Sequence, residues 1–216
     1  MSPVEASRML RPGLLDGVNV LLAAPAAARG GDGFADAVES ACSALGARLL
    51  RCPSLAGASH EHQEGASEDA VAAALGEMPS IDTLVLDAAG IFATEIAGAE
   101  ECRGAALGEC LQAAWTLTRA VFNLAFLPAQ CGRVLFLAPR SDSGTHSEPA
   151  LAGLENLSRT LSIEWSRHRV TAVTIAAGRL TPAGEVAAIA AYLASPAGAY
   201  FSGCLLDLRG PGGPQS

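Results

Sequence analysis

The sequence predicts the α/β fold class, as a single domain with a doubly wound parallel sheet of the Rossmann type. Short apolar runs alternate with longer segments of helical period along the chain. The short runs are apolar at successive positions rather than at every second one, which is typical of strands covered on both faces. Hydrophobic residues make up 50% of the 216 residues and charged residues 17%, which suits one sizeable core.

The first half of the chain begins this alternation. Residues 18–23 predict a buried strand, and residues 34–45 predict a helix because their apolar side chains recur at helical spacing up to a glycine. Residues 48–52 predict a second short strand, which a proline ends. Residues 54–66 are small and polar without period, which predicts a loop. A helix over 67–75 begins with a serine and two acids, residue types that a helix N-terminus favours.

The second half continues the alternation. Further strands are predicted over 82–86, 133–137, 170–175 and 203–208. Further helices are predicted over 107–127, 149–168 and 183–194. The helix over 107–127 has only Glu109 and Arg119 as charged residues, so we expect it to be buried against the sheet and against a partner. The single domain spans residues 1–216, and we expect its ends, 1–16 and 210–216, to be flexible.

Charge and cysteine content exclude several classes of function. The net charge is -8, all 14 basic residues are arginines and no basic run occurs, so we expect no nucleic-acid partner. No apolar stretch reaches the roughly 20 residues that span a bilayer, and the first residues lack a secretory pattern. The six cysteines have no metal-site spacing, and the histidines of residues 60–64 lie in the predicted loop. We therefore expect a cytoplasmic protein with reduced thiols and no metal.

Five segments resemble, in the same order, the short-chain dehydrogenase/reductase family. They are IDTLVLDAAG at 81–90, GRVLFL at 132–137, GLENLSRTLSIEW at 153–165, residues 170–178, and residues 192–196 with 200–203. The resemblance covers nearly the whole chain. It implies a Rossmann-type fold, a nicotinamide dinucleotide site, and a catalytic serine, tyrosine and lysine.

The catalytic positions depart from the family pattern. By the resemblance, Pro139 falls at the serine, Ser147 at the tyrosine and Leu151 at the lysine. A tyrosine with a pKa of about 10 exchanges protons poorly at neutral pH without a cationic neighbour. The chain contains no lysine, and its tyrosines, Tyr192 and Tyr200, lie outside the matching helix. The sequence therefore predicts a degenerate member that lacks the catalytic pair.

The dinucleotide positions are altered as well. Pro25 removes a backbone donor from the glycine motif, and Asp32 brings negative charge to where a phosphate would lie. Cys52 and Pro53 stand where an NAD site has an acidic residue, so that only Arg51 could serve an NADP-type site. The vestigial cofactor-binding positions are Ala24, Gly30, Gly31, Gly33, Asp87 and Ala88. We expect no cofactor, with NAD(P) as the alternative.

The leading hypothesis is a catalytically inactive subunit, a pseudoenzyme that assembles with an active dehydrogenase and stabilises or regulates it. The resemblance implies a partner of hydroxyacyl-thioester or steroid type, or a second copy of the chain, and contact through the long helix and the catalytic helix. The predicted interface residues are Trp115, Leu117, Val121, Leu154, Leu157, Leu161 and Trp165. Two alternatives stay open. One is a nucleotide- or ligand-sensing module with a residual dinucleotide pocket. The other is an NAD(P)-dependent oxidoreductase of alcohols or ketones with unconventional acid/base groups such as Asp87 or His146.

Overall fold

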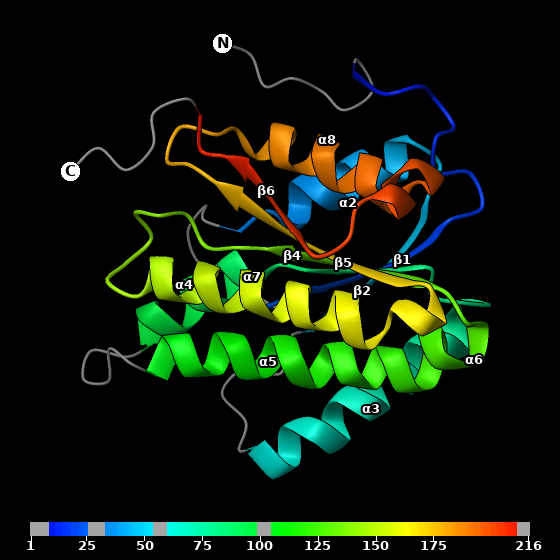
Figure 1. Ribbon diagram of the computed structural model, residues 1–216, viewed down its shortest axis with the longest axis horizontal. Coiled ribbons are helices and arrows are strands. Elements are labelled where there is room, and N and C mark those ends of the chain that lie inside the picture. The colour runs from blue at the N-terminus through cyan, green and yellow to red at the C-terminus, as the bar shows by residue number, and fades with distance from the viewer. Residues whose placement is uncertain (1–8, 26–32, 54–59, 99–104, 211–216) are drawn as a thin grey trace.

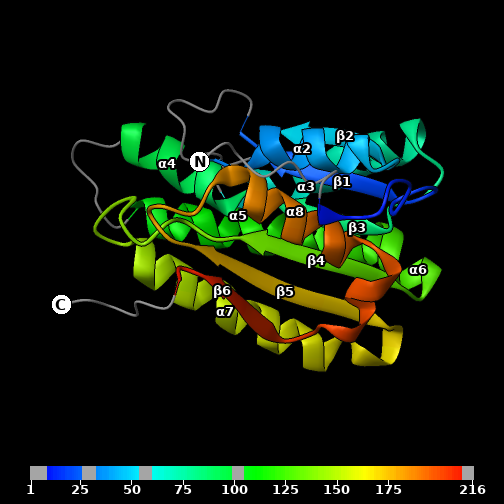
Figure 2. The same cartoon turned by 90° about the horizontal axis from the view of Figure 1, so that it is seen from above.

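A six-stranded, wholly parallel sheet lies at the centre of the structure, with helices on both faces (Figures 1 and 2). This computed structural model describes residues 9–25, 33–53, 60–98 and 105–210, with the backbone alone for 60–63, 97, 98 and 105. The strands are β1 (Asn19–Ala24), β2 (Arg48–Pro53), β3 (Thr83–Leu86), β4 (Gly132–Leu137), β5 (Val170–Ala177) and β6 (Cys204–Leu208). Their order is β2-β1-β3-β4-β5-β6, so the winding direction reverses between β1 and β3. The predicted doubly wound α/β class is confirmed.

The helices form two outer layers. One face of the sheet carries α2 (Ala35–Ala44) and α8 (Ala183–Ala194), which pack against each other (Figure 1). The other face carries α3 (His60–Glu77), α4 (Ala88–Gly98), α5 (Ala105–Val121) and α7 (Ser147–Glu164). Shorter turns are η1 (Phe122–Phe126), α6 (Leu127–Ala129), η2 (Ser166–His168) and η3 (Pro196–Tyr200).

Two hydrophobic cores fill the space between these layers. Successive side chains of a strand point to opposite faces of the sheet, so Leu84 and Leu86 belong to one core and Val85 to the other. Leu21 and Leu22 of β1 divide in the same way. Both faces are covered, and this is why the central strands have runs of apolar residues at successive positions.

Two helical segments differ from the prediction. α3 begins at His60, so residues 60–66 are helical and not a loop, while 54–59 lie outside the described residues. Glutamate, glutamine and alanine favour a helix. Because Glu64 and Gly65 are exposed, this part of α3 forms a helix without apolar residues at helical spacing, which is the pattern used for the prediction. α4 lies where the sequence predicts no helix. Its first turns, with Ile91 and Phe92, are buried and apolar nearly throughout, which removes the periodic signal.

The ends of other elements are also adjusted. Leu15 is fully buried and its N–H donates to Leu45 O at 2.9 Å, so this part of the segment 1–16 packs on the domain and is not a flexible end. Residues 1–8 and 211–216 lie outside the described residues. The long helix predicted over 107–127 ends as α5 at Val121 and continues through the wide turn η1 just before Pro128.

β2 is an edge strand in the part of the chain that the structure describes. In the Rossmann order 3-2-1-4-5-6 a further strand lies outside the second one. Here α3 is the one element between β2 and β3 in the part of this connection that the structure describes, residues 60–82. The side chains of Arg48, Arg51 and Pro53 are exposed on β2, and charged residues and proline are typical of an edge that must not pair with another chain.

Candidate functional site

The candidate site lies at the carboxyl edge of the sheet, where the strand order reverses. Ligands of doubly wound folds bind at such a switch point, beside the N-terminus of the helix that follows the first strand. In this structure β1 ends at Ala24, β3 ends at Leu86, and α2 starts at Ala35. A cavity of about 250 Å³ opens there. It is lined by Ala24, Pro25, Gly33, Ala35, Asp36, Arg51 and Asp87.

Asp87 occupies the centre of this edge. Its side chain is fully buried, and its Oδ2 accepts hydrogen bonds from the N–H groups of Phe34 at 2.9 Å and Ala35 at 3.0 Å. Its Oδ1 accepts a third bond from the N–H of Gly90 at 3.2 Å. Burial raises the pKa of Asp87 to about 6, against the opposite effect of these three N–H groups and of the Arg51 charge. Asp87 therefore bonds backbone groups at the sheet edge.

Two glycines make room for the carboxylate. A Cβ atom at Gly33 would lie 2.7 Å from Asp87 Oδ2, and one at Gly90 would lie 2.8 Å from the same oxygen. Both distances are far below a normal contact, so no larger residue fits while Asp87 keeps this position. Gly30 and Gly31, the other predicted glycines of the motif, lie outside the described residues. Gly33 thus serves the contact with Asp87.

Arg51 at the end of β2 is paired with acids. Its Nε lies 2.8 Å from Glu39 Oε2, and its Nη2 contacts Asp36 Oδ1. Both acids come from α2, so the ion pairs join the edge strand to the helix. The charge that could have served an NADP-type site is neutralised by two carboxylates.

Arg140 follows β4 and lies over the start of α2. Its guanidinium carbon is 4.8 Å from the centre of the Phe34 ring. Its Nη1 donates to Thr181 O at 2.8 Å and also to Gly178 O. Through these contacts one side chain connects the end of β4, the turn after β5 and the N-terminus of α2.

The three predicted catalytic positions hold packed or self-bonded residues. Ser147 is buried, and its hydroxyl lies 2.9 Å from Ser141 O and 2.8 Å from Gly144 O, to which it donates. Leu151 is buried in the core beneath α5 and α7, and Pro139 is buried after β4. None of the three side chains is an acid or base that could exchange a proton with a ligand.

The two tyrosines are used elsewhere. Tyr192 lies on α8 and packs edge-to-face against Phe201, with ring centres 6.1 Å apart. Tyr200 is 91% exposed on η3, just before the amino end of β6. Strands of a parallel sheet start at the edge opposite the candidate site, so Tyr200 belongs to that opposite edge.

The predicted interface residues divide into two groups. Four of them are buried inside the chain itself and offer almost no surface to a partner: Leu117, Val121, Leu154 and Leu161. The interface prediction is corrected for these four, because their apolar side chains fill the core under α5 and α7. Trp115 is 38% exposed, and Leu157 and Trp165 are half-buried. Trp165 stacks on Phe122 with ring centres 4.0 Å apart.

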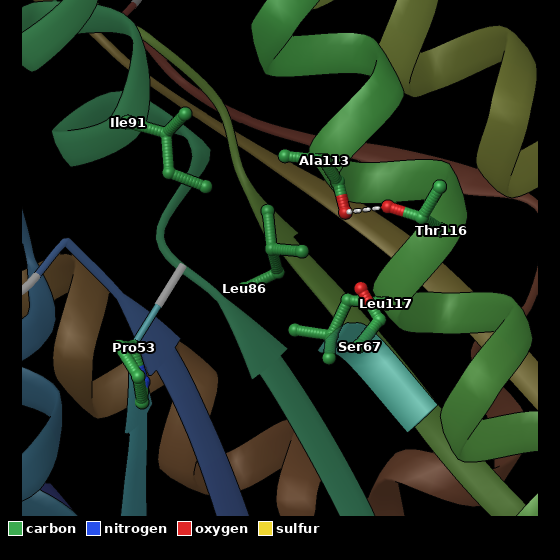
Figure 3. A pocket seen from close by; sticks show the side chains of 7 residues that line it. All are labelled: Pro53, Ser67, Leu86, Ile91, Ala113, Thr116 and Leu117. Carbon is green, nitrogen blue, oxygen red and sulfur yellow. Dashed lines mark hydrogen bonds between the residues drawn. The ribbon is translucent and has the colours of Figure 1, made fainter. Parts of the chain in front are cut away.

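A second, much smaller cavity lies between β3, α3, α4 and α5 (Figure 3). Its volume is about 10 Å³, which is room for about one water molecule. It is lined by Pro53, Ser67, Leu86, Ile91, Ala113, Thr116 and Leu117. Figure 3 shows the Thr116 hydroxyl bonded to Ala113 O, and the buried Ser67 Oγ has no hydrogen-bond partner. The cavity is too small for a nucleobase.

Within the described residues, no three His, Cys, Asp or Glu side chains gather as metal ligands. The side chains of His60 and His62 are not among those described. None of the helices described is both long and apolar enough to cross a membrane. The five described cysteines are free thiols, and Cys102 lies outside the described residues.

Comparison with known proteins finds no matching family model and no matching curated protein, but it finds many solved structures. A short-chain dehydrogenase from Mycobacterium smegmatis matches with a TM-score of 0.72 and 19% identity, over 93% of this chain and 95% of its own. The citronellol catabolism dehydrogenase of Pseudomonas aeruginosa PAO1 matches with a TM-score of 0.68 and 22% identity, over 93% and 96%. A hydroxysteroid dehydrogenase from Escherichia coli matches with a TM-score of 0.69 and 17% identity, over 93% of this chain and 99% of its own. This chain has the short-chain dehydrogenase fold.

The short-chain dehydrogenase fold implies a nicotinamide dinucleotide, and the described residues do not fit one. A phosphate at the N-terminus of α2 needs the N–H groups of Phe34 and Ala35, and Asp87 already accepts from both. The Asp87 carboxylate would also repel the phosphate. Arg51, the one cation among the described residues that line the cavity, is paired with acids of α2.

Sequence reasoning missed Arg140. In the sequence, Arg140 begins a polar segment that follows a predicted strand. An arginine directly after a buried strand and a proline is itself a signal for the carboxyl edge of the sheet. Its partners Phe34, Gly178 and Thr181 are far away in the sequence, so the contact itself has no sequence signal.

Proposed function

We propose that this chain is a non-catalytic protein of short-chain dehydrogenase fold that works by assembling with a related, active dehydrogenase. One observation carries the proposal. At the three positions where such an enzyme needs a serine, a tyrosine and a lysine, the chain has a buried proline, a serine bonded to its own backbone, and a leucine inside the core. A fold kept with these replacements is expected to act through its surface.

The surface formed by α5 and α7 is the proposed contact. These helices lie side by side on one face of the sheet (Figure 1). Trp115 on α5 is 38% exposed, and Ile163 on α7 is 75% exposed. Large apolar side chains exposed on neighbouring helices are typical of an interface with another protein.

The test is native mass spectrometry of the chain coexpressed with dehydrogenases of the same fold from its source organism. We expect a species that contains both subunits. The double variant Trp115→Glu with Ile163→Glu should dissociate it, because each change places a charge in the contact. Leu180→Glu, at an exposed apolar residue in the turn after β5 and on neither helix, is the control and should leave the complex intact. Separate masses for the two wild-type chains would refute the assembly.

A second candidate is a ligand-binding module, which the cavity of about 250 Å³ at the sheet edge favours. Calorimetry with NAD⁺, NADH, NADP⁺ and NADPH tests it directly. The absence of heat at millimolar ligand would discard dinucleotide sensing. Turnover of ketones or alcohols with the same cofactors would instead support an oxidoreductase with unconventional acid/base groups.

A further inference from the structure

We infer that the Asp87 carboxylate is a built-in substitute for a bound phosphate, and that Asp87 and Arg140 occupy part of the dinucleotide crevice, beside the remaining cavity of about 250 Å³. Asp87 and Arg140 would occupy the crevice in this way whether or not the chain assembles with a partner. It rests on the contacts of four described segments that meet at the carboxyl edge of the sheet.

Asp87 accepts hydrogen bonds from the N–H groups that would otherwise bind a phosphate. The N–H groups of the first helical turn have no partner inside the helix, and they are the groups that bind a phosphate at a helix N-terminus. At the start of α2 these are the N–H groups of Phe34 and Ala35. Both point at one oxygen, Asp87 Oδ2, at 2.9 and 3.0 Å. A carboxylate oxygen thus has the place of a phosphate oxygen.

Little space is left beside Asp87 Oδ2. Gly33 and Gly90 approach it so closely that a Cβ at either would lie 2.7 or 2.8 Å away. Pro25 Cδ lies 3.3 Å from the Cβ position of Gly90 and borders the same space. Asp87 is fully buried, so an incoming phosphate cannot share the donors without displacing it.

Arg140, which follows β4, occupies the neighbouring part of the crevice. Arg140 spans from the Phe34 ring to Gly178 O and Thr181 O. Two carbonyl oxygens engage its Nη1, and the guanidinium lies over an aromatic ring, so the group is held in place rather than left free for an anion. The N-terminus of α2 and the space between the ends of β4 and β5 are therefore filled by side chains of the chain itself.

The test uses inorganic pyrophosphate and NAD⁺ as probes in calorimetry at pH 8, where Asp87 is ionised. Asp87→Ala frees both N–H donors and removes the charge, so it should bind pyrophosphate about 10-fold more tightly than wild type, or better. Asp36→Asn is the matched control: it removes one carboxylate from the same cavity and frees neither donor. Because it also frees Arg51 from one of its two acids, any gain in its affinity measures the effect of charge alone and should stay well below the gain of Asp87→Ala.

Wild type that binds pyrophosphate or NAD⁺ as tightly as folded Asp87→Ala would overturn the inference. A second measurement needs no variant and covers the case in which Asp87→Ala does not fold. In wild type, the amide ¹⁵N and ¹H shifts of Phe34 and Ala35 should titrate together with a midpoint near pH 6, the pKa of the carboxyl they contact. Amide shifts of both residues that stay constant from about pH 3 to pH 8, across any titration of Asp87, would equally overturn it.

Discussion

Replacing Asp87 by asparagine should change how the stability of the protein depends on pH. Asparagine has nearly the same shape, keeps an oxygen for the N–H groups of Phe34 and Ala35, and carries no charge. In the folded state burial raises the pKa of Asp87 from 3.8 to about 6, which outweighs the effect of its three N–H donors. The folded state therefore holds the proton more tightly than the unfolded state does.

The size of the effect follows from the pKa change. A pKa raised from 3.8 to about 6 corresponds to ~3 kcal/mol, at about 1.4 kcal/mol for each pH unit. The pKa of Asp87 is higher in the folded state than in the unfolded state. The contribution of ~3 kcal/mol to the free energy of unfolding is therefore fully present below about pH 4 and is lost as pH rises through about 6. The Asp87→Asn variant lacks this loss. Because its NH2 group replaces one of the two accepting oxygens, the variant starts with a constant loss at every pH, but its stability relative to wild type should rise by ~3 kcal/mol between pH 4 and pH 8.

Urea unfolding followed by circular dichroism, at intervals from pH 4 to pH 8, measures the difference. The Arg51 guanidinium acts on Asp87, and the Cys110 thiol, which is near Asp87, stays neutral because burial raises its pKa to about 12. Both groups are present in both proteins and do not titrate between pH 4 and pH 8, so they add no step of their own to the comparison. Parallel stability profiles for wild type and Asp87→Asn, with no step near pH 6, would refute the reasoning.

Three further predictions follow from the packing. Arg140→Ala removes two hydrogen bonds from a charged group and the contact with Phe34, so urea unfolding should give a loss of ~2 kcal/mol; an unchanged midpoint would contradict the bridging role. Leu151→Lys, which restores the missing ammonium group, buries an unpaired charge and should cost ~3 kcal/mol or more by the same assay, without producing dehydrogenase turnover. Iodoacetamide at pH 8, followed by mass spectrometry, should label the exposed Cys131 at least ~10-fold faster than Cys42 and Cys110, because burial raises the pKa of both buried thiols to about 12; equal rates would contradict that ordering.

The strands were predictable because a doubly covered parallel sheet requires apolar residues at successive positions. Residues 82–86 and 133–137 stand out for this reason, and the structure places β3 and β4 there to within one residue. The helix α8 was predicted at both ends, since a proline precedes it and its apolar spacing is regular. α4 escaped prediction because an apolar stretch buried on several sides has no amphipathic period.

The sequence by itself also established that the chain contains no lysine. A chain without lysine cannot supply the ammonium group in any conformation, so this conclusion needs no structure. The resemblance also placed Asp87 among the vestigial cofactor-binding positions. Its place in the motif predicted that it would lie at the carboxyl edge of the sheet.

Only the tertiary structure decided what that acid does. Asp87 contacts Phe34 across 53 residues of sequence, and Arg140 contacts the turn after β5 across 38 and 41 residues. Local patterns record which face of a strand or helix is apolar. They do not record which distant backbone groups converge on one side chain, because that convergence depends on how the sheet twists and where each strand ends. The same limit explains Leu117, Val121, Leu154 and Leu161. The resemblance assigned their two helices to an interface, and the packing of α5 and α7 on the sheet decided that these side chains point inward.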